Sequence, residues 1–201
     1  EVFRLLPPFV VDKASKNMLS RDVINQIEDL FEVACIGLFE SLNCKAIRVD
    51  LDAYELESNF HDAPIACIDA RSTEVELIAG LQLPMSVLAL TYPVQGEISG
   101  VDEERLEDWI SELSNQLIGR LKTKLISHKC QIFLGLPITY FGADIGDLIS
   151  GESAIKTMYF DLDGESCACH ISIETFNDEL AFSAEVDESV DVIAEGEIEL
   201  F

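Results

Sequence analysis

The sequence has little positive charge and no long apolar run, and each shortage excludes a class of protein. It holds 13 Lys and Arg residues against 38 Asp and Glu residues, which gives a formal net charge of −25. A field of this sign repels phosphate backbones and anionic membrane surfaces, so we expect neither nucleic acid nor a membrane as a partner. No apolar run reaches the roughly 18 residues that a membrane-spanning helix needs. The charge itself names no partner, because an acidic surface is also what keeps many cytoplasmic proteins in solution.

The cysteines are scattered and do not resemble a disulfide framework. Four of the six are far apart in the sequence and mostly have apolar neighbours: Cys35, Cys44, Cys67 and Cys130. A chain of 201 residues needs no disulfide bonds to fold, so this usage indicates a reducing cytoplasm. The only cluster is Cys167–His170, in an alternating stretch that predicts a strand with both sulfurs on one face. Buried strand cysteines and a zinc site are both open interpretations, although no second ligand pair exists elsewhere in the sequence.

The length and the 48% hydrophobic content suit one domain with extensions. We expect residues 1–20 to be a loose N-terminal lead-in and residues 21–180 to form the folded domain. Residues 181–201 form an acidic extension, which is either an edge strand with a charged outer face or a frayed end. The chain begins at Glu1 rather than Met, which leaves a preceding signal peptide or domain open.

Two long helices stand out in the hydrophobic pattern. Apolar residues at three- and four-residue spacing predict a helix from Asp22 to Leu42, capped by Ser20 or Asp22. A clearer helix is predicted from Asp102 to Ser127, because acidic residues crowd its start and lysines its end. Strands are predicted at residues 45–51, 65–70, 74–82, 86–92, 130–135, 138–141, 155–162 and 166–175. The strand at 86–92 is ambiguous, since a short apolar run can take either form.

The second predicted helix separates an apolar stripe from a polar ridge. At about 100° per residue, five aliphatic residues gather on one side and should face the core: Ile110, Leu113, Leu117, Leu121 and Leu125. Nearly opposite, within roughly 60° of one another, lie Asp108, Glu112, Asn115 and Gly119, which we call the polar ridge. Every amphipathic helix has a polar face that is usually only solvated. The spacing alone therefore does not make the ridge a functional site.

Two members of the polar ridge are unusual for a merely solvated surface. Gly119 lies in mid-helix, where glycine costs about 1 kcal/mol relative to alanine. A glycine is understandable there if another backbone comes close. Asn115 is a poor helix former one turn from Glu112, and helix stability does not call for it. Both residues favour a functional ridge.

The sequence contains the spacing Asp108-x3-Glu112-x2-Asn115, followed four residues later by Gly119, and 21 residues separate Asn115 from Pro137. This pattern resembles the signature of the CheC/CheX/FliY family of chemotaxis phosphatases. From Glu112 the run reads ELSNQLIGRLKTKLISHKCQIFLGLPITYFG. The resemblance is strong over residues 102–142, weaker over the first helix and the strands near 155–175, and absent from both ends. It implies a CheX-like α+β fold, with a mostly antiparallel sheet packed with two long helices.

The chain departs from that family in one segment before the motif. CheX-like chains place a helix between their early strands and the motif helix. Here residues 80–93 look short, proline-broken and strand-like. A homodimer is compatible with the resemblance, but this departure bears on any interface built like the family's.

The resemblance also implies an activity, hydrolysis of the aspartyl phosphate of a CheY-like response regulator. The regulator would supply Mg²⁺ and a Lys near the phosphate, so the phosphatase would need no cofactor of its own and only has to place the water. Asn115 is implied to orient that water, and Glu112 to pair with the regulator's Lys. Asp108 would add a peripheral contact and Gly119 would allow close approach. Pro137 is expected to be structural, shaping the strand entry beside the helix.

Two other functional readings stay open. One is a non-catalytic scaffold that binds a response regulator or a flagellar switch component, and the other is an unrelated acidic α/β domain with a chance motif. Retention of Asn115 beside Glu112 favours catalysis, because a pure binding surface has no need of the carboxamide. The sequence does not say which regulator is the substrate or whether the pathway is chemotaxis.

Two nearby residues also have alternative interpretations. A second Glu-x-x-Asn occurs at Glu40–Asn43, but Ile36 stands where the motif has an acid or Ser, and the tetrapeptide ends a helix. We therefore interpret Asn43 as a helix C-cap rather than as part of a second site. Trp109, beside the motif, is either a core-edge residue or part of the docking rim.

Overall fold

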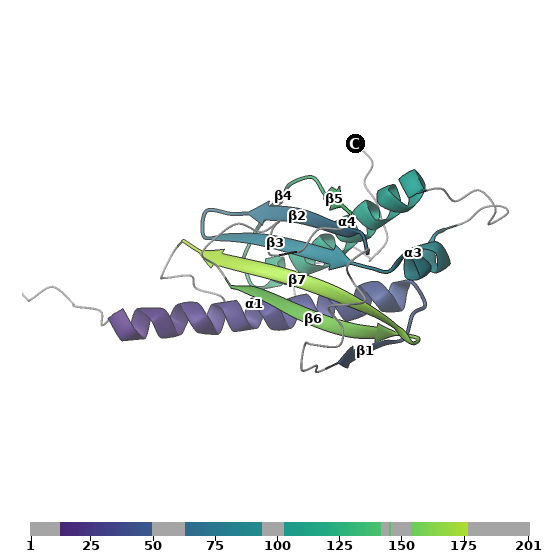
Figure 1. The fold of residues 1–201 in the computed structure, drawn as a ribbon. Coiled ribbons are helices and arrows are strands. Elements are labelled where there is room, and N and C mark those ends of the chain that lie inside the picture. Colours follow the sequence, from purple (N-terminus) through teal and green to yellow (C-terminus); the bar gives the residue numbers. More distant parts are fainter. Residues whose placement is uncertain (1–12, 50–62, 94–102, 142–144, 146–153, 177–201) are drawn as a thin grey trace, which may run out of the picture.

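The computed structural model describes residues 13–49, 63–93, 103–141, 145 and 154–176. The acidic extension at 181–201 and residues 1–12 of the lead-in lie outside this part, so the predicted domain boundaries stay predictions. In chain order the elements are α1 (Lys13–Ser41), β1 (Ala46–Val49), β2 (Ile65–Arg71), β3 (Val75–Gln82), α3 (Met85–Thr91), α4 (Glu103–Ser127), β4 (Phe133–Leu134), β5 (Ile138–Tyr140), β6 (Ile155–Leu162) and β7 (Glu165–Thr175) (Figure 1).

The strands form one sheet in the order β1-β6-β7-β3-β2-β4, and β5 also pairs with β2. Each of these pairings is antiparallel. β4 and β5 occupy opposite ends of the same edge of β2, at residues 70–71 and 65–67 respectively. The long helices α1 and α4 cover one face of the sheet (Figure 1). This two-layer arrangement confirms the predicted α+β fold with a mostly antiparallel sheet.

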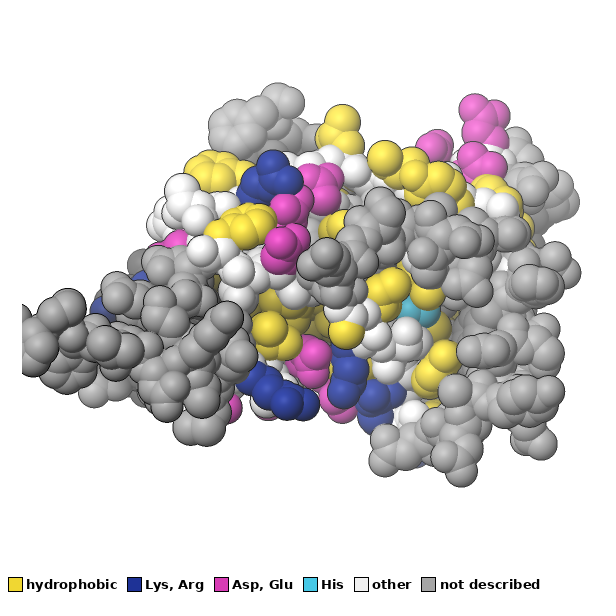
Figure 2. Space-filling view, turned by 60° about the vertical axis from the view of Figure 1, so that its left-hand side comes forward, with side chains coloured by type: hydrophobic (Ala, Val, Ile, Leu, Met, Phe, Trp, Pro, Cys, Tyr) yellow, Lys and Arg dark blue, Asp and Glu magenta, His cyan; other side chains and the backbone are white. Residues whose placement is uncertain are grey.

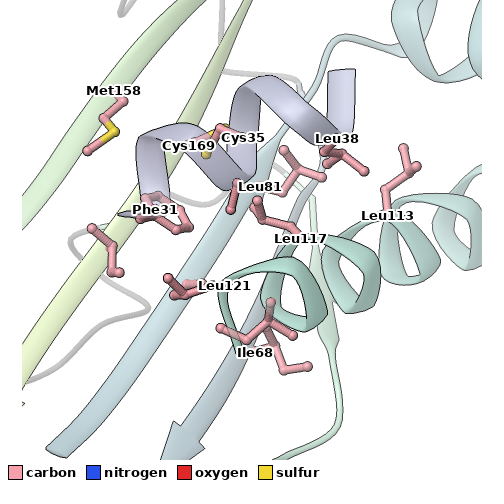
Figure 3. Packing of buried hydrophobic residues seen from close by; sticks show 14 of the residues in the cluster. Phe31, Cys35, Leu38, Ile68, Leu81, Leu113, Leu117, Leu121, Met158 and Cys169 are labelled. Atoms are coloured by element: carbon pink, nitrogen blue, oxygen red, sulfur yellow. The ribbon is translucent and has the colours of Figure 1, made fainter. Parts of the chain in front are cut away.

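The core lies between the two long helices and that face of the sheet. All five predicted aliphatic residues of α4 are completely buried: Ile110, Leu113, Leu117, Leu121 and Leu125. Phe31 and Leu38 of α1 face them, and alternate residues of the strands, such as Ile68 and Leu81, complete the cluster (Figure 3). Full burial of a side chain of this size contributes about 1.5–3 kcal/mol to stability. The apolar stripe of α4 thus fixes the rotation of the helix, and the polar ridge must lie on its other side.

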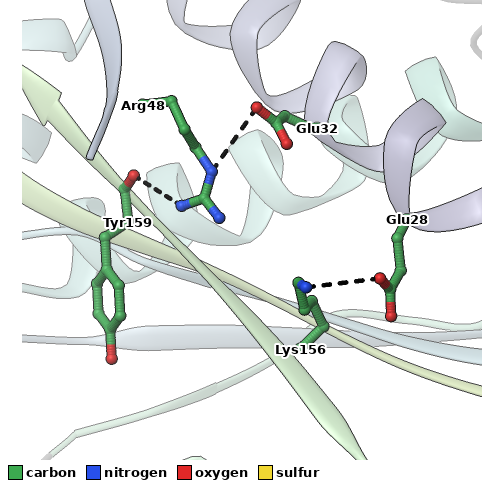
Figure 4. Close-up of polar contacts among 5 residues, drawn as sticks. All are labelled: Glu28, Glu32, Arg48, Lys156 and Tyr159. Carbon is green, nitrogen blue, oxygen red and sulfur yellow. Dashed lines mark hydrogen bonds and ion pairs between the residues drawn. The ribbon is translucent and has the colours of Figure 1, made fainter. Parts of the chain in front are cut away.

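Charged contacts fasten α1 to the opposite edge of the sheet from α4 (Figure 4). Arg48 of β1 lies 3.7 Å from Glu32 of α1, and its Nη1 donates to the carbonyl oxygen of Tyr159 at 3.0 Å. The guanidinium carbon also stacks 5.5 Å from the centre of the Phe160 ring. Arg48 thus connects α1 with β1 and β6.

The first helix begins earlier than the sequence pattern predicts. α1 starts at Lys13, so it runs continuously through Ser20 and Asp22, and neither residue caps it. Residues 13–21 contain no proline, glycine or β-branched residue that would stop a helix. They also lack an apolar stripe, which is why hydrophobic periodicity missed them. Within the described part of the chain, no helix is long and apolar enough to cross a membrane.

The predicted strand at 86–92 is wrong, because this segment is the helix α3. Pro84 occupies the N-cap position, where a helix needs no backbone N–H donor, so the N–H that proline lacks is not missed. Pro93 forces Tyr92 into an extended conformation, which ends the helix. Val87 and Leu88 are buried side by side while Leu90 is 78% exposed, a pattern that a half-buried strand cannot produce. Hydrophobicity alone could not separate the two forms.

The edge formed by β4 and β5 is apolar and exposed. Phe133, Leu136 and Ile138 expose 78%, 82% and 56% of their surfaces. Figure 2 shows hydrophobic side chains along the upper border of the molecule, where Figure 1 places these strands. In the link between them the backbone of Gly135 donates to the carbonyl of Asp69 at 2.8 Å. A Cβ on Gly135 would collide with the Asp69 carboxylate, so a larger residue there would require the exposed Asp69 side chain to move.

Candidate functional site

The polar ridge lies on the outer side of α4. Asp108 is exposed, and Glu112, Asn115 and Gly119 are half-buried among their helical neighbours. A Cβ placed on Gly119 would meet no atom within 4 Å. The packing of the described residues therefore does not require glycine at this position. The structure brings the four predicted residues together on one partly exposed face of α4.

Both flanks of α4 are fastened to neighbouring elements near the ridge. On one side the hydroxyls of Ser111 and Thr139 of β5 lie 2.7 Å apart. On the other side Trp109 Nε1 donates to Thr91 Oγ1 of α3 at 3.1 Å, and its ring packs edge-on against Tyr92. Trp109 also packs against the core, which confirms the core-edge interpretation. The ridge is thus presented by a helix that is held in place before any partner arrives.

The two central residues of the ridge keep free capacity for an outside partner. Gln116 Nε2 donates to Glu112 Oε1 at 3.0 Å, which leaves the second carboxylate oxygen of Glu112 available. The side-chain amide of Asn115 has no hydrogen-bond partner among the described residues. Gln116 was missed in the sequence analysis, although its i,i+4 spacing from Glu112 is a known signal for such a contact. A carboxylate and an uncommitted carboxamide therefore face the same side.

Pro137 and the second Glu-x-x-Asn fall where a structural role suits them. Pro137 immediately precedes β5, the strand whose Thr139 contacts α4. Asn43 has a left-handed φ of 60°, just after the end of α1. The backbone N–H of Cys44 closes the helix end by donating to the carbonyl of Phe39 at 3.0 Å. Asn43 is thus confirmed as the residue that terminates α1.

The cysteine cluster of β7 is part of the core. Cys167 and Cys169 are buried on the helix side, and Cys169 lies against Cys35 of α1 (Figure 3). Burial raises the pKa of the Cys169 thiol, as does the neighbouring Cys35. His170 points to the other face, where its Nδ1 lies 3.0 Å from Thr157 Oγ1. The interpretation as buried strand cysteines is confirmed. All six cysteines are free thiols, and the described residues contain no group of three or more His, Cys, Asp or Glu placed to hold a metal ion.

The open space at Gly119 leads to a prediction about stability. Gly119→Ala should raise the free energy of unfolding by about 0.5–1 kcal/mol, because alanine stabilises a helix interior and meets nothing here. Chemical denaturation monitored by circular dichroism measures this directly. Gly37 of α1 offers a comparison, since a Cβ there would make only ordinary van der Waals contact with Arg120 Nη1, 3.7 Å away, and Gly37→Ala should gain a similar amount. Loss of stability in Gly119→Ala would show that the chain itself needs this glycine.

No protein-family model matches the sequence, and no curated protein matches it. Solved structures do match the fold. The chemotaxis protein CheX from Vibrio vulnificus superposes with a TM-score of 0.60 at 14% identity, covering 74% of this chain and 96% of that one. The chain has the CheX-like fold. A CheC-like superfamily protein from Shewanella sp. PV-4 matches with a TM-score of 0.56 at 14% identity, covering 74% and 97% of the two chains.

A third match is CheX from Borrelia burgdorferi, solved as a complex with CheY, BeF3 and Mg²⁺. It has a TM-score of 0.52 at 14% identity, and covers 73% of this chain and 96% of that chain. The CheX-like fold implied by the motif in α4 is therefore confirmed. α3 removes the departure noted in the sequence, because it supplies a helix between the early strands and α4.

Proposed function

We propose that this protein hydrolyses the aspartyl phosphate of a CheY-like response regulator. The observation that carries the proposal is the partly exposed ridge of α4. There the Glu112 carboxylate and the Asn115 amide, which has no partner among the described residues, lie near Gly119, where a Cβ would meet nothing within 4 Å. CheX from Borrelia burgdorferi has the same fold as this chain, and its complex with CheY supports the choice of partner. The proposed site of action is the cytoplasm.

Asn115 is the residue proposed to act on the water. An aspartyl phosphate is already activated, so its hydrolysis requires water in line with the breaking P–O bond and charge neutralisation on the phosphoryl oxygens. The oxygen of the Asn115 amide can accept a hydrogen bond from that water and so orient a lone pair of the water toward phosphorus. A carboxylate in the same place would add negative charge beside a phosphoryl group that is already anionic. A neutral amide therefore suits this step, which is one of orientation.

The other ridge residues are proposed to dock the regulator. Glu112 would pair with the regulator's active-site Lys through its free oxygen and so set the register of α4 against the phosphate. Asp108, exposed one turn earlier, would add a peripheral polar contact. Gly119 would let the regulator's backbone approach the helix. The Mg²⁺ that neutralises the phosphoryl oxygens is assigned to the regulator, and the chain is proposed to need no cofactor of its own.

The proposal is tested by incubating the protein with a panel of phosphorylated regulators from the same genome. We expect at least one regulator to lose its phosphate about tenfold faster or more than it does alone, as the orientation of water by a fixed group provides. Decay of radiolabelled aspartyl phosphate measures the rate, and heat-denatured protein is the control. Binding of a regulator without faster decay would instead support the scaffold function.

A further inference from the structure

We infer that Gln116 is a positioning residue, which holds the Glu112 carboxylate away from Asn115 and thereby keeps the Asn115 amide available for water. The inference rests on the proposed function and deepens it. Its basis is the 3.0 Å hydrogen bond from Gln116 Nε2 to Glu112 Oε1. Both side chains are half-buried on α4, which favours a persistent contact over one that water replaces.

The positions around the helix axis decide which way the carboxylate turns. At about 100° per residue, Gln116 lies roughly 40° to one side of Glu112 and Asn115 roughly 60° to the other. Gln116 and Asn115 therefore compete for the same carboxylate from opposite sides. The hydrogen bond to Gln116 draws Glu112 toward the flank where Trp109 meets α3. Asn115 lies on the other flank of α4, toward β5, and its amide is then not hydrogen-bonded to Glu112.

Without Gln116, Glu112 would turn to its remaining neighbour. Residues three apart on a helix are in reach of one another, so the Asn115 amide N–H could donate to the carboxylate. That contact would rotate the amide and occupy it, and it would also leave Glu112 badly placed for a cation on the regulator. A neutral donor at position 116 avoids both effects. A lysine there would neutralise Glu112 and compete with the regulator's ammonium group.

The test is a double-mutant cycle on the full chain. Gln116→Leu keeps the helix and the approximate size but removes the donor. We expect it to weaken binding of a regulator carrying beryllofluoride and Mg²⁺ by roughly three- to tenfold, because an ordered Glu112 side chain binds at lower entropic cost. It should also lower kcat, because Glu112 then occupies the Asn115 amide that orients the water. In a Glu112→Ala background the same substitution should have no effect on Kd. Ser127→Ala is the control, since it removes a different side-chain hydrogen bond about three turns further along α4.

A second measurement needs no regulator. The side-chain amide signals of Asn115 in the NMR spectrum of the free protein should shift in Gln116→Leu, as Glu112 turns toward them, and should not shift in Ser127→Ala. An equal loss of affinity in both backgrounds of the cycle would overturn the inference, and so would unmoved Asn115 signals. Failure of the wild type to bind any regulator would instead count against the proposed function, while the NMR result still decides the role of Gln116.

Discussion

Replacing Asn115 with alanine is expected to slow dephosphorylation of a bound regulator by about a hundredfold, because orientation of a reactant typically accounts for rate effects of this size. The complex itself should form nearly as well as with the wild type, since the Asn115 amide holds water rather than the regulator. Single-turnover decay of the aspartyl phosphate, with the protein in saturating excess, separates the two quantities. The fold should tolerate the change, because alanine stabilises a helix and the amide has no partner among the described residues.

The chain contains its own control for this experiment. Asn43 also ends a Glu-x-x-Asn sequence, but it sits at the end of α1 with a φ of 60°. Asn43→Gly removes that amide and keeps a residue that adopts the left-handed conformation easily, so the rate should not change. Wild-type rates in Asn115→Ala, at matched stability, would remove the reason to call the protein a phosphatase and leave the scaffold function.

The long helices and most of the sheet could be predicted from the sequence because each of them buries a regular pattern. Leu117 and its neighbours repeat at helical spacing, and the buried cysteines of β7 alternate with residues of the other face. Where burial is irregular the prediction failed. α3 is a short helix between two prolines, and the spacing of its apolar residues fits a helix or a strand. The start of α1 has no apolar face. In such segments local sequence does not contain the information that tertiary packing supplies.

The site divides in a similar way. The polar ridge could be predicted, because a rotation of about 100° per residue alone brings Asp108, Glu112, Asn115 and Gly119 together. The contacts that hold the ridge in place could not be predicted from the sequence. The hydroxyl contact of Ser111 with Thr139 joins residues 28 positions apart, and its existence depends on how β5 is placed against β2. A motif thus names the reacting groups, whereas the fold determines how firmly they are held.

Glu112→Ala is expected to weaken regulator binding by roughly thirtyfold or more, because truncating one partner of a close charge pair costs about 2–5 kcal/mol. Glu112→Lys should weaken it by roughly a hundredfold or more. The lysine variant should lose more affinity than the alanine variant, because it places one ammonium group against another. Titration with a regulator carrying beryllofluoride and Mg²⁺ measures the affinities. Raising the ionic strength should reduce the difference in affinity between wild type and Glu112→Lys, since salt screens charges that remain near solvent.

The large negative charge of the protein calls for a control that changes charge elsewhere. Glu40→Lys alters the net charge of −25 by the same amount as Glu112→Lys, but Glu40 is exposed near the end of α1. If the general field of the protein governs association, both variants will change affinity by the same amount. If Glu112 meets a specific cation, only its own replacement will matter, and the bound fraction of that variant should still hydrolyse phosphate through Asn115. A Glu112→Lys variant that binds normally would show that α4 docks in another register, and the assignment of Asn115 to the water would then lose its geometric basis.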